Sequence, residues 1–303
     1  MKRSAIFLSV AVLIALLLST MQAVPALSAG NGEGDRVMVQ YVHGQRGAAE
    51  SALHGVGAQF HYSFDDLDAF AVTIPAAAVN GILHNPNFVL VEEDQPRYLI
   101  GMTPSVAAGV SATDTIDPDG QVVPYGIDMV QARDVWDADR DGVIDTGAPT
   151  GSNRTICVID SGLYVDHVDL TGINLLGGYP AGWNTDYFGH GTHVVGTIAA
   201  MNNDLGVVGV TPGTINLYIV KVFGDDGAWA YSSTLVDAAN RCASAGANII
   251  SMSLGGSKSS TTEQRAFNTL YNNGILSIAA AGNDGSTIYN YPASYASVVS
   301  VAA

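Results

Sequence analysis

The chain has 303 residues, a formal net charge of −16 and apolar side chains at 48% of its positions. That apolar share is enough to build a core and excludes intrinsic disorder. The acidic balance argues against a nucleic-acid partner, because phosphate binding needs clustered Lys and Arg. With only 2 Cys the chain is not a disulfide-stapled scaffold. Its length suggests one medium domain and a smaller one.

The first 30 residues have the pattern of a secretory signal peptide. Residues 1–3 are a short basic start, 5–18 are almost wholly apolar, and 19–30 are small and polar. A transmembrane anchor is the alternative, but the apolar run is short for a span of about 20 residues. We therefore expect residues 1–29 to be a signal peptide and the mature protein to be secreted, without a membrane anchor.

The next region predicts a small α+β domain at residues 35–98. Its expected order, β-α-β-β-α-β, is a split βαβ unit. The expected strands are 36–42, two runs within 60–74, and 88–91, and the expected helices are 47–53 and 76–83. Residues 99–120 turn polar and contain Pro and Gly, which is typical of a linker.

Strands and helices alternate through residues 121–303, which predicts a doubly wound, mostly parallel sheet. The expected strands are 155–159, 216–223, 247–252, 275–280 and 298–301, and the expected helices are 194–201, 232–244 and 262–271. Ser232 or Ser233 is expected to cap the second helix. Functional residues of such sheets gather at the carboxyl ends of the strands.

Polar residues follow two of the predicted strands and open one of the predicted helices. Asp160 ends the first strand, His190 opens a helix, and Asn283 follows the strand 275–280. Taken singly, Asp160 could be a cap and Asn283 a turn former. His190 and His193 are spaced for a metal pair, but the segment lacks the Glu of a zinc-hydrolase helix, which disfavours zinc.

Four segments together resemble the subtilisin family of serine endopeptidases, in the family's order. They are Val-Ile-Asp-Ser-Gly at 158–162, His-Gly-Thr-His-Val-Val-Gly at 190–196, Ser-Met-Ser-Leu-Gly-Gly at 251–256 and Ala-Ala-Ala-Gly-Asn at 279–283. The resemblance implies a subtilisin-like α/β fold for residues 121–303. It also implies that residues 35–98 are a propeptide, a chaperone and intramolecular inhibitor that is cut off when the zymogen matures.

The resemblance also implies the roles of single residues. Asp160 is expected to be the triad carboxylate and His190 the general base, because a serine hydroxyl attacks only when an imidazole removes its proton. Asn283 is expected to donate to the oxyanion. Six further residues are assigned to substrate binding: Ser253, Leu254 and Gly255 as an edge that pairs with substrate backbone, and Ala280, Ala281 and Gly282 as one wall of a roomy primary pocket.

The family's nucleophile segment, Gly-Thr-Ser-x-Ala, does not occur in this sequence. Its two Gly-Thr pairs, at 191–192 and 213–214, are followed by His193 and Ile215. The resemblance places the serine beyond residue 303, so this chain alone is predicted to be inactive. An incomplete protease is favoured because Asp160, His190 and Asn283 are intact. The alternative is a non-catalytic paralogue that acts as a binding or inhibitor protein.

Aspartate is in excess in residues 120–303, where 15 of 16 acidic residues are Asp. Such an excess indicates loops, caps and cation ligands. One loop has the spacing of an EF-hand at its positions 1, 3, 5, 7 and 9, namely Asp137, Asp139, Asp141, Val143 and Asp145. Position 12 is Ala148, so the bidentate Glu is absent. A solvated acidic turn is the alternative, but these carboxylates repel one another without a cation, which favours calcium.

A second calcium site is implied by the resemblance alone. Its ligands would be the side chains of Gln121, Asp169 and Asn203 and the carbonyls of Met201, Leu205 and Val207. Hard oxygen donors of this kind suit Ca²⁺.

The sequence also gives expectations for the two cysteines and for the binding partners. Cys157 falls in the first buried strand and Cys242 near a helix end, and we expect two buried thiols, with a bridge left open. The expected partners are polypeptide substrates and the chain's own propeptide, with no nucleic acid and no membrane, and the protein is expected to be a monomer.

Overall fold

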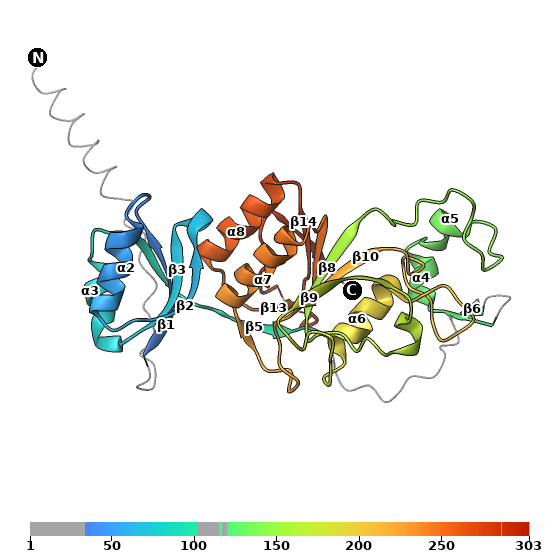
Figure 1. Cartoon of the computed structure of the whole chain (residues 1–303), viewed down its shortest axis with the longest axis horizontal. Helices are drawn as coiled ribbons and strands as arrows, with labels where there is room; N and C mark the ends of the chain where they lie inside the picture. The colour runs from blue at the N-terminus through green and yellow to red at the C-terminus, as the bar shows by residue number, and fades with distance from the viewer. Residues whose placement is uncertain (1–33, 102–114, 117–119, 286, 303) are drawn as a thin grey trace, which may run out of the picture.

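The computed structural model describes residues 34–101, 115–116, 120–285 and 287–302. Within them the chain forms a small part and a larger part, each built on its own sheet (Figure 1). The predicted signal peptide and most of the predicted linker lie outside the described residues. Among the helices that are described, none is long and apolar enough to cross a lipid bilayer.

The small part, residues 35–93, is an antiparallel sheet with the strand order β2-β3-β1-β4. Its chain order is the predicted split βαβ unit. The elements are β1 (Asp35–Tyr41), α2 (Arg46–Gly55), β2 (Gln59–Phe64), the 3₁₀ helix η1 (Asp65–Leu67), β3 (Ala69–Ile74), the 3₁₀ helix η2 (Ala76–Ala78), α3 (Val79–Leu83) and β4 (Phe88–Glu93).

The larger part is built on a six-stranded sheet with the order β15-β14-β12-β8-β10-β9, in which every pairing is parallel. Helix α6 packs on one face and helices α7 and α8 on the other (Figure 1), which confirms the predicted doubly wound α/β fold. The elements are β8 (Thr155–Asp160), β9 (Asn174–Tyr179), α6 (His190–Ala199), β10 (Asn216–Lys221), α7 (Ser232–Ser244), β12 (Ile249–Met252), α8 (Thr261–Asn272), β14 (Leu276–Ala280) and β15 (Val298–Val301).

Shorter elements surround these sheets. Three of them, β11, β5 and β13, form a small sheet of their own that joins the two parts. The short elements are β5 (Pro96–Leu99), β6 (Thr115–Ile116), β7 (Val122–Val123), α4 (Tyr125–Met129), α5 (Arg133–Trp136), the 3₁₀ helix η3 (Val168–Leu170), β11 (Ala230–Tyr231) and β13 (Leu254–Gly255).

Strand β9 was not predicted. Its sequence, NLLGGY, contains two glycines, which are depleted in strands and weaken the strand pattern. A close approach requires the second of them, because a Cβ atom on Gly178 would lie 2.4 Å from Cδ2 of Trp183. The glycine that obscures the strand in the sequence is therefore what allows this edge strand to pack.

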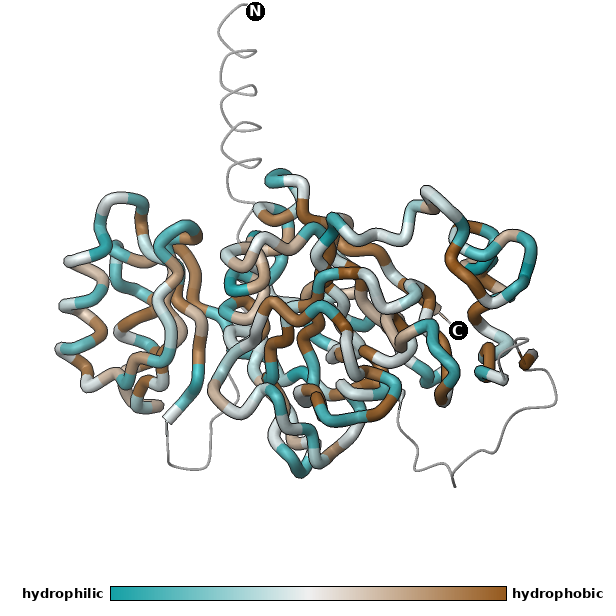
Figure 2. The backbone as a smooth tube through the Cα atoms, turned by 45° about the vertical axis from the view of Figure 1, so that its right-hand side comes forward, coloured by the Kyte–Doolittle hydropathy of each residue, from teal (hydrophilic) through white to brown (hydrophobic). Residues whose placement is uncertain are grey.

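Successive side chains of a strand point to opposite faces of the sheet. In the small sheet both of these faces are buried. Val37 and Val39 of β1 belong to the apolar cluster under α2 and α3. Met38, between them, belongs to a second cluster that includes Val236 of α7 and Ala266 of α8. The small sheet is thus covered by its own helices on one face and by the larger part on the other. Figure 2 shows hydrophobic stretches of backbone in both parts.

Two carboxylates, one at the end of the small part and one directly after it, cap helices α7 and α8. Asp94 accepts from the backbone N–H of Ser233 at 2.8 Å, at the start of α7. Glu92 accepts from the backbone N–H groups of Thr261 and Thr262 at 2.8 Å each, at the start of α8. These are the orphan donors and the positive ends of the helix dipoles. The expectation that a serine caps α7 is wrong, because the N-cap residue is Tyr231 and Asp94 supplies the acceptor.

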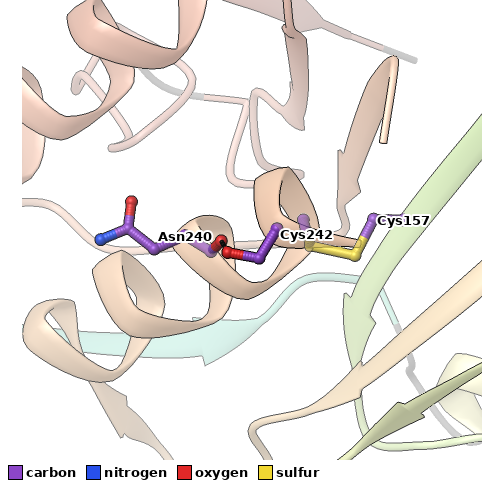
Figure 3. The surroundings of a disulfide bond; sticks show 4 residues. Cys157, Asn240 and Cys242 are labelled. Carbon is purple, nitrogen blue, oxygen red and sulfur yellow. Dashed lines mark hydrogen bonds between the residues drawn. A yellow bond between two sulfur atoms is a disulfide. The ribbon is translucent and has the colours of Figure 1, made fainter. Parts of the chain in front are cut away.

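The two cysteines form a disulfide between β8 and α7 (Figure 3). The Cα atoms of Cys157 and Cys242 lie 5.6 Å apart, and both side chains are fully buried. The expectation of two free thiols is therefore wrong, although their burial was predicted. The residues are 85 positions apart, and only the passage of α7 over β8 brings them together. The bond holds α7 against the central strand of the sheet.

Candidate active site

Asp160 and His190 meet at the switch point of the large sheet. Asp160 is the last residue of β8, where the strand order runs to β10 on one side and to β12 on the other. His190 is the first residue of α6. Their side chains are buried, and Oδ1 of Asp160 lies 2.7 Å from Nδ1 of His190. Crevices at such switch points are where functional residues of these sheets gather.

The surroundings of His190 favour its protonated form. Burial lowers the pKa of His190, but the hydrogen bond to Asp160 and the charge of that carboxylate outweigh burial and raise the pKa above its ordinary value. A carbonyl on the other ring nitrogen adds to the effect, since O of Ile100 lies 3.1 Å from Nε2. This arrangement fixes the proton on Nδ1 and stabilises an imidazolium, as a general base requires.

Asp186, which sequence reasoning missed, holds the start of α6 in place. Its Oδ1 accepts from the hydroxyl of Ser161 and the N–H of Gly189, each at 2.9 Å. Its Oδ2 accepts from the N–H of Thr192 at 2.8 Å and from the Thr192 hydroxyl at 2.6 Å. Burial raises the pKa of Asp186, but these hydrogen bonds outweigh it and leave the pKa below its ordinary value. The signal available in the sequence was an Asp just before a helix start.

Strand β5 lies between two edge strands of the larger part, and its end reaches this pair. It pairs antiparallel with β11 on one edge and with β13 on the other. The next residue continues the pattern, since the N–H of Ile100 donates to O of Ser253 at 2.9 Å. Its own carbonyl is the group that faces Nε2 of His190. Thus the edge expected to receive substrate, Ser253 with Leu254 and Gly255, carries a segment of the chain itself.

Asn283 lies beside the end of this segment. A Cβ atom on Gly101 would be 3.5 Å from Nδ2 of Asn283, so the amide group lies close to the peptide that follows Ile100. Asn283 is exposed. An amide N–H at this place can donate to the oxyanion that forms when a nucleophile attacks the Ile100 carbonyl carbon.

The residues assigned to the wall of the primary pocket have Asn290 as a close neighbour. Ala280 ends β14, and Ala281 and Gly282 follow it. A Cβ atom on Gly255 would lie 2.4 Å from Nδ2 of Asn290, and one on Gly282 would lie 3.3 Å from the same atom. The Asn290 side chain therefore lies close to both glycines. Nothing in the local sequence marked Asn290.

The acidic loop brings three of its predicted ligands together. Carboxylate oxygens of Asp137, Asp139 and Asp141 lie within 4.8 Å of one another, close enough to hold one cation. Asp145 is outside this group, and its Oδ2 accepts from the N–H of Ala138 at 2.9 Å. Val143 donates its N–H to Oδ1 of Asp141 at 2.8 Å.

The second predicted calcium site is a cradle of oxygens around one amide group. Nε2 of Gln121 lies within hydrogen-bond distance of four acceptors, which are the carbonyls of Met201, Leu205 and Val207 and Oδ1 of Asn203, at 2.8, 2.6, 3.1 and 3.3 Å. Oδ1 of the buried Asp169 has no hydrogen-bond partner among the described residues. Converging oxygens with an orphaned carboxylate atom nearby fit a Ca²⁺ site.

The sequence and the fold are similar to those of known proteins. The pattern of the subtilase family matches residues 151–303. Subtilisin amylosacchariticus of Bacillus subtilis subsp. amylosacchariticus is 34% identical over 256 residues, which cover 82% of this chain and 58% of that protein. Subtilisin DY of Bacillus licheniformis is 38% identical over 190 residues, which cover 60% of this chain and 65% of that one. The chain thus spans less than two thirds of either relative.

Two solved structures have the same fold. The psychrophilic subtilisin-like protease Apa1 from Pseudoalteromonas sp. AS-11 aligns with a TM-score of 0.51 at 47% identity, over 59% of this chain and 40% of that chain. Fervidolysin from Fervidobacterium pennivorans, a keratinolytic enzyme, aligns with a TM-score of 0.62 at 22% identity, over 90% of this chain and 44% of that chain. The second likeness extends across the small part as well and concerns the fold alone.

Replacement of Asp186 by Asn should destabilise the protein by about 1–3 kcal/mol at neutral pH, because the partly buried donors of Thr192 lose a charged acceptor. The folded-state pKa of Asp186 is depressed, so its stabilising contribution is present above the ordinary pKa and disappears as the pH falls through the lower value. Urea unfolding across the acidic range should therefore show the difference between wild type and variant shrinking with acidity. The exposed Asp166, changed to Asn, is the control. A difference that is independent of pH contradicts the assignment.

Proposed function

Because the chain belongs to the subtilase family, we propose that it functions as a serine endopeptidase that hydrolyses peptide bonds of polypeptides. Asp160 and His190 are two members of its Asp-His-Ser triad. In the family's order of segments the serine comes after the segment that ends at Asn283. The contact that supports the proposal best is that of the Ile100 carbonyl with Nε2 of His190 at 3.1 Å.

The geometry of the pair supplies the acid–base chemistry. Nε2 of His190 takes the proton of the serine hydroxyl as the oxygen attacks the substrate carbonyl, and later gives it to the leaving amine. Asp160 holds the opposite N–H and stabilises the imidazolium in between. Asn283 donates its amide N–H to the oxyanion, a contact worth about 3–4 kcal/mol in the barrier.

The small part acts as an inhibitory propeptide of a zymogen. β5 lies in the groove as an added strand, with backbone pairing on both edges, which is the way extended peptides bind to sheet edges. Ile100 then stands immediately before the bond to be cleaved, and Gly101 immediately after it. Cleavage at this bond leaves residues 35–100 bound as a product, which blocks the groove until the small part is removed.

We also propose that the protein is secreted and acts as a monomer. Residues 1–29 carry the signal-peptide pattern. The disulfide is in keeping with an oxidising compartment outside the cytoplasm, where such bonds persist.

Both oxygen clusters are proposed to bind Ca²⁺. The first uses the carboxylates of Asp137, Asp139 and Asp141. In the second, Gln121 turns its amide oxygen toward the cation, alongside Asp169, Asn203 and the carbonyls of Met201, Leu205 and Val207. Bound calcium would stabilise the fold, since a cation that binds only the folded state shifts the equilibrium toward it.

Replacement of His190 by Ala should leave the protein expressed from its complete coding sequence as an unprocessed, inactive chain. Removing the general base of a triad lowers turnover by a factor on the order of 10⁴ or more. His193, exposed and one turn further along α6, is the matched control, and His193→Ala should mature normally. Gel analysis and hydrolysis of a peptide substrate measure both effects. Processing and hydrolysis that survive His190→Ala would refute the proposal.

Removal of calcium should lower the melting temperature of the same protein. Calcium at 100 times its Kd contributes about 2.7 kcal/mol, which corresponds to about 5–10 °C for a domain of this size. Asp139→Asn and Asn203→Ala, one in each cluster, should each reduce the loss caused by chelation. Identical melting curves with calcium and with a chelator would show that neither cluster binds it.

A further inference from the structure

An arginine and a glutamate form a buried pair beside the active site. Arg97 of β5 is 1% exposed and Glu263 of α8 is fully buried. The guanidinium donates twice, from Nε to Oε1 at 3.0 Å and from Nη2 to Oε2 at 2.5 Å. Two parallel N–H···O bonds of this kind are the geometry in which Arg recognises a carboxylate most specifically.

The surroundings of Glu263 favour a negatively charged carboxylate group that is able to bind a cation. The Tyr295 hydroxyl lies 2.7 Å from Oε2 of Glu263. Burial and the nearby charge of Glu263 raise the pKa of Tyr295, so the hydroxyl keeps its proton and donates it. Glu263 also lies in the first turn of α8, where the helix dipole favours a negative charge.

The position of Arg97 relative to the catalytic pair is fixed by backbone pairing. Ile100 presents its carbonyl to His190, and counting back along β5 makes Arg97 the fourth residue before the cleaved bond. Arg97 pairs with Ala230 of β11. Its neighbour Tyr98 is 50% exposed, as expected for side chains that alternate across a strand. An added strand in this register therefore places its fourth side chain against Glu263.

We propose that Glu263 makes the enzyme select substrates with arginine at the fourth position before the cleaved bond. This inference rests on the proposed function, because it assigns the place of β5 to substrates. A substrate arginine restores the two hydrogen bonds of the buried carboxylate, whereas an apolar side chain leaves that carboxylate without its partner, which is costly in a buried site. A lysine gives a single point charge in place of the two-pronged contact.

The test uses two blocked tetrapeptides with a fluorogenic amide at the C-terminus, Arg-Tyr-Leu-Ile and Leu-Tyr-Leu-Ile. The first copies residues 97–100, and the second differs only at the fourth position. The enzyme is the processed form obtained from the complete coding sequence. Wild type should cleave the arginine peptide with a kcat/KM ten- to hundredfold above that of the leucine peptide. Glu263→Gln should reduce the ratio to below about threefold, mainly by slowing the arginine peptide.

Variants of both partners separate specificity from maturation. Arg97→Leu alters only the part that is removed, so its processed enzyme should keep the wild-type ratio, although maturation should be slower. Arg97→Leu with Glu263→Leu restores a matched pair in the precursor. The enzyme matured from this double variant should prefer the leucine peptide, a reversal that a merely structural role of Glu263 does not produce.

The outcomes distinguish a failure of the role of Glu263 from a failure of the protease assignment. Equal cleavage of both peptides by wild type, or an arginine preference that survives Glu263→Gln, overturns the role of Glu263 and leaves the protease assignment intact. A wild-type protein that neither matures nor cleaves either peptide overturns the protease assignment and this inference with it.

Discussion

The backbone pairing of β5 with two edges of the larger part is the interaction on which the arrangement depends. Because β5 adds to β11 and β13 at once, its register determines which carbonyl reaches His190 and which side chain reaches Glu263. A slip by one residue would turn every side chain of the strand to the opposite face. The contact at Ile100 and the buried pair at Arg97 are therefore two consequences of one register.

Charge complementarity between the two parts supports that register. Glu92 and Asp94 satisfy the first N–H groups of α8 and α7, and Arg97 meets Glu263 on the first turn of α8. These contacts lie within six residues of the chain, directly before the segment at the active site. Residues 92–97 thus supply what the ends of both helices lack, which agrees with the propeptide role proposed above. Removal of the small part leaves these groups to water or to a substrate.

Local patterns predicted the fold class well and, in outline, the meeting of Asp160 with His190. Buried strands read as continuous apolar runs, so the parallel, doubly wound class of the large sheet followed from alternation, although β9 with its two glycines was missed. The position of Asp160 at a strand end and of His190 at a helix start placed both near one edge. What the sequence could not show depends on contacts between distant residues. The disulfide spans 85 positions, and Arg97 and Glu263 are separated by 166. The approach of Asn290 to Gly255 likewise joins residues that are distant in the sequence.

The bond between Ile100 and Gly101 is the most direct place to test the proposed function, because the roles given to Asn283 and Glu263 depend on its position beside His190. The measurement is the intact mass of the fragments released in the first minutes of maturation of the complete protein. The register of β5 predicts an N-terminal fragment that ends at Ile100. A first fragment that ends elsewhere, at any residue between 102 and 120, would contradict the register and with it the positions assigned to His190, Asn283 and Glu263.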